Sequence, residues 1–361
     1  MPRRSYHGLV ESTLTTCFPN FIDQPNILSS YIPRCSRMIP VKVVVVTMFE
    51  RGTPDDGDVG ELELWVKREK LDTVIPFPIG STDLRMNEDG VLAVLTGMGA
   101  SNAATVVTAL GCDPRFDLSK TYWLIAGIAG VDPMNASIGS AAWAEYVVDG
   151  DIMHEVDASE MPDGWPYGKI SLSSSKPNHR VPHSTDSDIV HRLNPSLVDW
   201  AYQLTRDYQL PDEPELAEFR AQYEGFPEAV KPPFVLKGDI LGSSSYWHGP
   251  VLTGWANDWV KMYTEGKGTF VMANMEDHGT VTALHSLSKA GLIDYDRILV
   301  LRTASNYSTP PPGEDVQWHF TAPFVLQGMP SFDAAHRVGS IVVHEIIQNW
   351  ETFENNFPKP A

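Results

Sequence analysis

The chain has 361 residues, of which 42% are apolar and 20% charged, so it can bury a large core and is too apolar to be disordered. Its 46 acidic residues outnumber the 27 basic ones, and the net charge of −19 disfavours nucleic acid and anionic lipid as partners. The longest apolar runs fall short of the roughly 18 residues that a membrane span needs, so no span is expected.

Strands and helices alternate along the chain. The run of valines at 43–46 is typical of a central strand that is covered on both faces. Strands are predicted over residues 41–46, 91–95, 122–126, 140–148, 235–240, 269–272 and 298–301, and helices over residues 102–110, 195–208, 279–290 and 337–350. This alternation predicts an α/β fold with a twisted mixed sheet flanked by helices.

The domain organisation follows from composition. Residues 1–38 are predicted to be an N-terminal extension, with disorder as one interpretation, and residues 39–355 to be a single domain. Serine and proline are frequent from about 151 to 233, which predicts an insertion, either a flap over the site or a surface decoration.

The cysteines and the N-terminal sequence bear on the cellular compartment of the protein. Cys17, Cys35 and Cys112 are sparse, and no pair of them has metal-ligand spacing, which favours a reducing environment. The first 37 residues contain no continuous apolar core typical of a secretory signal. We therefore expect a cytoplasmic protein with no metal and no other cofactor.

Small and polar residues follow four of the predicted strands. They lie at 96–102, 126–130, 274–279 and 302–307, and the first of these segments is a glycine-containing loop that enters a helix. In open α/β sheets, the ends of the strands form the edge at which ligands bind. The glycine loop lacks both the dinucleotide-binding and the P-loop patterns, so it predicts either a site for hydroxyl or anionic groups or a tight packing turn.

These segments read VVVVTMFE, LTGMGASNAA, WLIAGIAGVDP, ANMEDHGTVTAL and LRTASNYS. In this order and spacing they resemble the purine nucleoside permease family, within the nucleoside phosphorylase and nucleosidase superfamily, over residues 40–350. The resemblance implies a three-layer nucleoside phosphorylase-like fold, cleavage of the N-glycosidic bond of purine nucleosides, and a homo-oligomer in which neighbouring subunits complete the site. Since no membrane span is predicted, we favour an enzyme over a carrier.

The resemblance assigns the sugar and the base to different residues. Glu276 matches the glutamate that accepts hydrogen bonds from both ribose hydroxyls, and Met275 matches the methionine that packs under the ribose. Asn306 occupies the position where many relatives carry an aspartate that protonates purine N7. An amide donates a hydrogen bond but delivers no proton, so either 6-oxopurines leave as stabilised anions or another residue is the acid, with Asp277 and His278 close in sequence.

Further substrate contacts are expected around these residues. The loop at 242–249 matches the family loop whose aromatic ring stacks on the purine, with Tyr246 and Trp247 as candidates. The remaining substrate-binding candidates at the strand ends are Thr96, Gly97, Asn274 and Ser305.

The nucleophile distinguishes hydrolysis from phosphorolysis. A phosphate or water site is expected near Arg51, Gly99 and Ser101, with Arg85 reaching it from a neighbouring subunit if phosphate binds. A water nucleophile needs a carboxylate base, for which Glu50 is the candidate. Because the glycine loop offers no basic side chain, we favour hydrolysis, with phosphorolysis and non-catalytic nucleoside binding linked to uptake as alternatives.

Overall fold

The computed structural model describes residues 38–52 and 59–360. The predicted N-terminal extension, apart from Met38, therefore lies outside the described residues. The fold lies within the unit that begins at Ile39.

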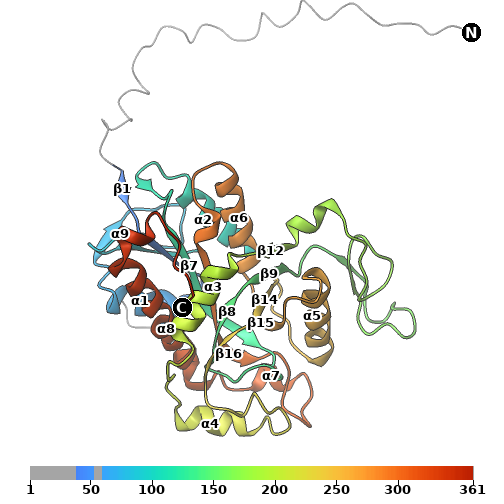
Figure 1. Ribbon diagram of the computed structural model, residues 1–361. Helices are drawn as coiled ribbons and strands as arrows, with labels where there is room; N and C mark the ends of the chain where they lie inside the picture. The colour runs from blue at the N-terminus through green and yellow to red at the C-terminus, as the bar shows by residue number, and fades with distance from the viewer. Residues whose placement is uncertain (1–37, 53–58, 361) are drawn as a thin grey trace, which may run out of the picture. The chain divides into compact units, whose positions relative to one another are not determined.

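A mixed sheet, to which twelve strands of the described residues belong, forms the centre of this unit (Figure 1). Its core is built from β2 (Val43–Thr47), β5 (Val91–Leu95), β7 (Tyr122–Val131) and β16 (Ile298–Tyr307). β2 pairs in parallel with β5 and β7, and β16 pairs in parallel with the other edge of β7. Every residue of β2 is buried, as the continuous valines predict for a strand covered on both faces.

The other strands extend this core on both sides. Their order in the sheet is β12-β9-β14-β15-β7-β2-β5-β4-β3, with β8 and β13 joined to it through β16. Their bounds are β3 (Thr73–Ile75), β4 (Leu84–Met86), β8 (Ala141–Ala144), β9 (Tyr146–Asp149), β12 (Val190–Arg192), β13 (Val235–Lys237), β14 (Asp239–Gly242) and β15 (Phe270–Asn274). Two separate pairs are β1 (Ile39–Pro40) with β6 (Phe116–Asp117) and β10 (His154–Glu155) with β11 (Lys169–Ile170).

Helices flank the sheet. α8 packs on β7 and β16, with α1 and α3 against it, whereas α5 packs on β14 and β15, and α2 lies beside α6 (Figure 1). Their bounds are α1 (Glu61–Arg68), α2 (Ala100–Gly111), α3 (Pro195–Thr205), α4 (Pro214–Ala221), α5 (Pro250–Tyr263), α6 (Asp277–Lys289), α7 (Trp318–Thr321), α8 (Met329–Gln348) and α9 (Trp350–Phe353). The predicted α/β class with a mixed sheet and flanking helices is confirmed.

Two predicted strands are too short. β7 continues to Val131 and β16 to Tyr307, so residues 126–130 and 302–307 lie within strands rather than after them. Small residues are needed in this part of β7 because β16 side chains approach it closely. A Cβ at Gly127 would lie 2.6 Å from the Arg302 side chain. The predicted strand over 140–148 is divided at Glu145 into β8 and β9.

The region predicted as an insertion contains several elements. β10 and β11 pair with each other, β12 pairs with β9 at the edge of the main sheet, and α3 packs against α8. Asn194 caps α3 by accepting hydrogen bonds from the backbone N–H groups of Ser196 and Leu197. That these residues are an insertion remains a prediction.

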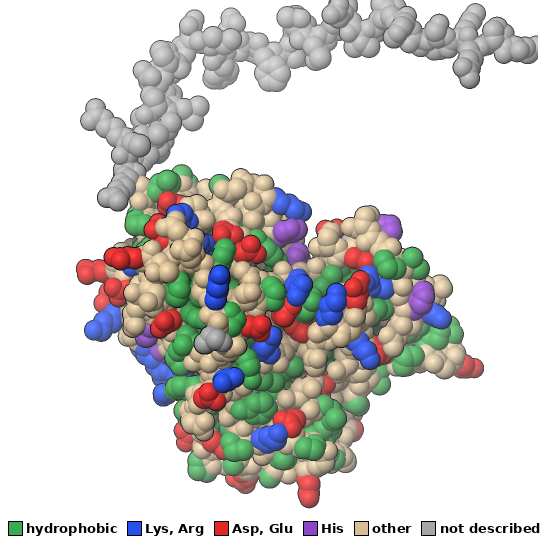
Figure 2. Space-filling model, viewed as in Figure 1, with side chains coloured by type: hydrophobic (Ala, Val, Ile, Leu, Met, Phe, Trp, Pro, Cys, Tyr) green, Lys and Arg blue, Asp and Glu red, His purple; other side chains and the backbone are tan. Residues whose placement is uncertain are grey.

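Acidic and basic side chains are interspersed on the face of the described residues drawn in Figure 2. No helix of the described residues is both long enough and apolar enough to cross a bilayer.

Candidate active site

A cavity of about 420 Å³ lies where β7, β15 and β16 end. Two glutamates, Glu276 and Glu61, line it together with Asn306, which lies near the end of β16. The other lining residues are mostly apolar: Met48, Phe49, Met98, Ile128, Ala129, Gly130, Tyr246, Ala273, Asn274, Met275, Ser305 and Phe324. A mostly apolar pocket with a few convergent polar groups is typical of a small-molecule site.

Glu276 is held at the N-terminus of α6. Its Oε1 accepts a hydrogen bond from Gly99 N at 3.2 Å, and its Oε2 accepts one from Met275 N at 3.2 Å. Asn274 fixes this turn, because its Oδ1 accepts hydrogen bonds from the backbone N–H groups of Glu276 and Asp277 at 3.0 and 2.9 Å. Gly99 has φ +89°, a conformation in which other residues are strained. The ANMED segment and the glycine loop therefore converge on one carboxylate.

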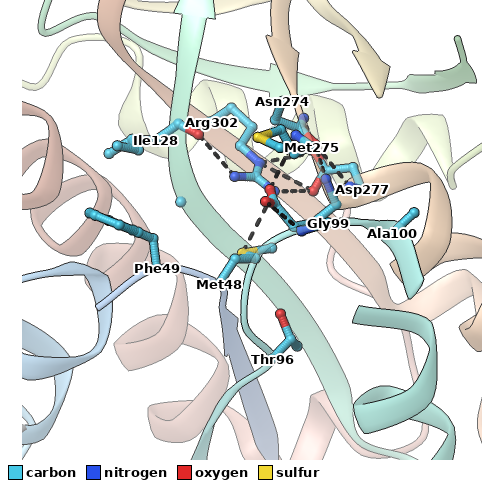
Figure 3. A network of polar contacts seen from close by, with 12 residues as sticks. Met48, Phe49, Thr96, Gly99, Ala100, Ile128, Asn274, Met275, Asp277 and Arg302 are labelled. Atoms are coloured by element: carbon cyan, nitrogen blue, oxygen red, sulfur yellow. Dashed lines mark hydrogen bonds and ion pairs between the residues drawn. The ribbon is translucent and has the colours of Figure 1, made fainter. Parts of the chain in front are cut away.

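Arg302 lies behind Glu276 and is almost fully buried, with 1% of its surface exposed. Its Nε donates to both carboxylate oxygens of Asp277 at 3.1 and 3.0 Å, and its Nη1 donates to Ile128 O at 2.9 Å (Figure 3). Its Nη2 lies 3.4 Å from Glu276 Oε2. Burial raises the pKa of Glu276 above its ordinary value, and the charge of Arg302 opposes this rise.

Glu61, the first residue of α1, is the site residue that our sequence analysis missed. Its Oε2 accepts hydrogen bonds from Met48 N and Phe49 N at 2.7 and 3.0 Å, and its Oε1 accepts one from Ile128 N at 2.7 Å. Burial raises the pKa of Glu61 to about 7, although the charge of Arg302 and these hydrogen bonds act in the opposite direction. A carboxylate with this pKa can take up and release a proton near neutral pH.

A helix pattern begins at this residue in the sequence. The segment ELELWVKR places Leu62, Trp65 and Val66 on one face of a helix, begins with acidic residues and ends with basic ones. Because Glu61 is eleven residues beyond the strand-end glutamate Glu50, the motif at the end of β2 does not include it.

Gly127 packs closely against the side chains of both Glu61 and Arg302. A Cβ at Gly127 would lie 2.6 Å from both Arg302 Nη1 and Glu61 Oε1. We expect Gly127→Ala to lower the free energy of unfolding by about 1–3 kcal/mol, because both side chains are buried and must shift. Denaturant unfolding measures this change. Gly254→Ala on α5, where a Cβ meets nothing within 4 Å, is the matched control and is expected to stabilise slightly; equal effects of the two variants would contradict the prediction.

Asn306 reaches the cavity through an irregularity of β16. The pairing with β7 passes from Ala304 opposite Ala129 to Asn306 opposite Gly130, so Ser305 is an extra residue. Ser305 Oγ lies 3.2 Å from Ala129 O and 3.1 Å from Asn306 Oδ1, to both of which it can donate. As a result, Ser305 and Asn306, although adjacent in sequence, both line the cavity.

The aromatic candidates differ in position. Tyr246 lines the cavity, is 60% exposed, and its hydroxyl lies 2.9 Å from His319 Nε2. Trp247 packs against Trp255 and Phe270, with ring centroids 5.7 and 6.2 Å away. Trp247 lines a small adjoining cavity of about 20 Å³ and not the main one, so Tyr246 is the one of these two candidates that lines the main cavity.

Several predicted residues do not line the cavity. Glu50 Oε2 accepts hydrogen bonds from Leu62 N and Glu63 N at the start of α1, at 2.9 and 3.1 Å, so it stabilises the helix end. Glu50 is therefore not among the residues that line the cavity, whereas Glu61 is.

The residues predicted for phosphate are dispersed. Arg51 binds the side chain and the carbonyl of Gln327, and Arg85 belongs to β4. In the glycine loop, the Thr96 hydroxyl donates to Gly97 O, and Ser101 is exposed on α2. Gly99 contacts a residue of the cavity through its hydrogen bond to Glu276, and the Arg51 guanidinium lies over the ring of Phe324, another lining residue, 5.7 Å from its centroid.

The fold and the cavity define an α/β protein with a carboxylate-lined pocket at the ends of its strands. The family model for purine nucleoside permeases matches residues 40–358. The chain belongs to the purine nucleoside permease family, as its sequence motifs predict.

Named relatives and solved structures are similar to the chain. A purine nucleoside permease of Candida albicans is 32% identical over 265 residues, which are 72% of this chain and 65% of that protein. A probable purine nucleoside permease of Schizosaccharomyces pombe is 31% identical over 227 residues, 60% of this chain and 64% of that protein. The chain thus spans slightly less than two thirds of the length of these relatives.

Among solved structures, a 5′-methylthioadenosine/S-adenosylhomocysteine nucleosidase of Neisseria meningitidis is similar with a TM-score of 0.44 and 16% identity, covering 84% of this chain and 99% of that chain. A futalosine hydrolase of Helicobacter pylori is similar with a TM-score of 0.47 and 15% identity, covering 84% of this chain and 98% of that chain.

Proposed function

We propose that the protein hydrolyses the N-glycosidic bond of purine nucleosides, releasing the base and ribose. The observation that carries this proposal is that Glu276, Asn306 and Glu61 line one cavity. Cleavage of this bond develops positive charge on the sugar and negative charge on the base, so a carboxylate at the sugar and a hydrogen-bond donor at the base both stabilise the transition state.

In this arrangement, different residues bind the sugar and the base. Glu276 accepts hydrogen bonds from the two ribose hydroxyls, and Met275 packs under the ring. Tyr246 and Asn306 both line the small cavity that adjoins the main one, which supports a base stacked on Tyr246 with its edge against Asn306. Because an amide donates a hydrogen bond and no proton, 6-oxopurine nucleosides such as inosine and guanosine are the preferred substrates.

Water is the nucleophile in this proposal, and Glu61 is the general base. Among the described residues that line the cavity there is no lysine, arginine or histidine. A phosphate dianion prefers such side chains, whereas water needs a carboxylate within hydrogen-bond reach. Arg302 lies nearby, but Asp277 engages its guanidinium. This distribution of charge supports hydrolysis over phosphorolysis.

The test measures the products. The protein is incubated with inosine, guanosine, adenosine and uridine, each with and without phosphate, and free base, ribose and ribose 1-phosphate are determined. Release of hypoxanthine from inosine without phosphate is the expected result. Strict dependence on phosphate would select phosphorolysis instead.

Nucleoside binding linked to uptake is the second candidate function, and the name of the family favours it. The same assay, combined with equilibrium dialysis of inosine, distinguishes it, because binding without release of base is its expected outcome.

We also propose a cytoplasmic homo-oligomer. Met98 and Tyr246 line the cavity, yet 55% and 60% of their surfaces are exposed, so a second copy packed against them would narrow the mouth of the cavity. The sparse cysteines support a reducing compartment.

The pH dependence follows from Glu61. A general base acts in its ionised form, and the pKa of this carboxyl is about 7 because of its burial. We expect kcat/KM for inosine to rise about tenfold per pH unit below pH 7 and to level off above it. Initial rates between pH 5 and 9 measure this profile, and a flat profile from pH 5 to 7 would contradict the role of Glu61.

A further inference from the structure

The carboxylate of Asp151, which follows β9, contacts two separate segments beside the cavity. Its Oδ1 accepts a hydrogen bond from Ser243 Oγ at 2.6 Å, and its Oδ2 accepts one from Ser244 N at 2.9 Å. The same Oδ2 lies 3.1 Å from His278 Nε2. One side chain thus holds the loop after β14 and the first turn of α6.

Each of these segments carries a residue of the cavity. Ser243 and Ser244 begin the loop that leads to Tyr246, and His278 is two residues beyond Glu276. Asp151 itself is not among the residues that line the cavity.

Ser244 extends the network to a third segment. Its Oγ accepts a hydrogen bond from Ala100 N, the first residue of α2, at 3.3 Å. The preceding residue, Gly99, donates to Glu276 Oε1 at 3.2 Å. The loop with Tyr246, the glycine loop and the start of α6 are therefore joined around the Asp151 carboxylate.

Charge strengthens the contact between Asp151 and His278. Only 4% of His278 is exposed, and burial alone would lower its pKa, but the hydrogen bond to Asp151 and the charges of Asp149 and Asp277 raise the pKa above its ordinary value. Burial of the Asp151 carboxyl acts to raise its pKa, but its hydrogen bonds with His278, Ser243 and Ser244 hold the pKa well below its usual range. Both shifts favour the charged forms of His278 and Asp151, and hydrogen bonds between charged groups are stronger than neutral ones.

The position of the His278 ring leaves no room for a side chain at Gly242. A Cβ there would lie 2.4 Å from His278 Nδ1. The end of β14, the imidazole ring and the Asp151 carboxylate are consequently packed as one unit.

We propose that Asp151 is a positioning residue for the substrate, which holds Tyr246 and Glu276 at the separation that a nucleoside requires. This inference rests on the proposed function, since it assigns the base to Tyr246 and the sugar to Glu276. The hydrogen bonds of Glu61 are with Met48, Phe49 and Ile128, and those of Asn306 are with Ser305 and Tyr307, so these two side chains are held by groups outside this network.

The test replaces Asp151 with Asn, which keeps the size of the side chain and removes its charge. We expect KM for inosine to rise about ten- to hundredfold, the range for a small displacement of binding groups, and kcat to fall as well, because Glu276 also stabilises the transition state. Equilibrium dialysis of inosine is expected to give the same change in Kd. Because dialysis needs no turnover, it tests the positioning role even if the wild-type protein binds inosine without cleaving it.

Asp239→Asn is the matched control. Asp239, the first residue of β14, likewise accepts backbone hydrogen bonds through its carboxylate, from Glu145 N, Tyr146 N and Thr269 N at 3.1, 2.8 and 2.7 Å, and it is not among the residues that line the cavity. We expect this variant to lower the thermal midpoint without changing KM or Kd.

Two outcomes would overturn the proposal: unchanged KM and Kd in Asp151→Asn, or the same rise in both variants, which would indicate a general loss of packing. Should Asp151→Asn fail to fold, Ser244→Ala removes the contact with Ala100 and leaves the ion pair intact. This variant is expected to raise KM and Kd about three- to tenfold, as for one hydrogen bond, and unchanged values would equally overturn the proposal.

Discussion

Glu276→Gln is expected to lower kcat/KM for inosine by about 10²- to 10³-fold, the range measured when one group that stabilises transition-state charge is removed. Glutamine has nearly the same shape, but it offers one acceptor oxygen for two ribose hydroxyls and carries no charge to balance the developing positive charge on the sugar. Initial rates with inosine measure the loss.

The fold is expected to survive this substitution. Gly99 and Met275, whose backbone N–H groups donate to Glu276, are half-buried and can donate to the amide oxygen instead, and Asp277 remains paired with Arg302. Circular dichroism and the thermal midpoint are the controls, and a Glu276→Ala variant is expected to abolish turnover. Near-normal rates in either variant would refute the role of Glu276 at the sugar.

Glu61→Gln is expected to reduce kcat by about 10²- to 10⁴-fold, because it removes the base that takes a proton from water. The residual rate is expected to lose the rise with pH below about 7, since the group with that pKa is absent. Rates across pH 5–9 measure both effects.

Two other glutamates provide the comparison. Glu63 is buried on the same helix and pairs with Lys67, so Glu63→Gln controls for a change in α1. Glu50→Gln tests the residue that the strand-end motif favours as the base. If Glu50→Gln abolished turnover while Glu61→Gln did not, the base would be Glu50 after all.

The sequence motifs predict one side of the cavity well. Glu276 and Met275 lie in a short segment that enters a helix, and Asn306 lies near the end of a long strand, so linear patterns place them at the correct edge of the sheet. The geometry around Glu276 depends on a residue two positions earlier, because Asn274 Oδ1 accepts a hydrogen bond from Glu276 N. A short sequence motif includes both residues.

The other side of the cavity is formed by contacts between segments that lie far apart in the chain. Glu61 reaches Ile128 N, 67 positions away in the chain, and no linear pattern indicates this approach. Glu50 is a strand-end glutamate like those of many sites, but its carboxylate binds the N-terminus of α1. The predicted strand for β7 is too short for a related reason: glycine and alanine have low strand propensity, and the close approach of Arg302 and Glu61 to Gly127 is visible only in the folded chain.

The extra residue in β16 has a consequence for how substrate preference can diverge. Because Ser305 is an extra residue, the backbone directs position 306 to the cavity whatever side chain that position carries. A single codon change at 306 can therefore exchange an amide for an acid while the neighbouring strand pairing is kept, whereas deletion of one residue from the same strand would turn its following side chains toward the other face.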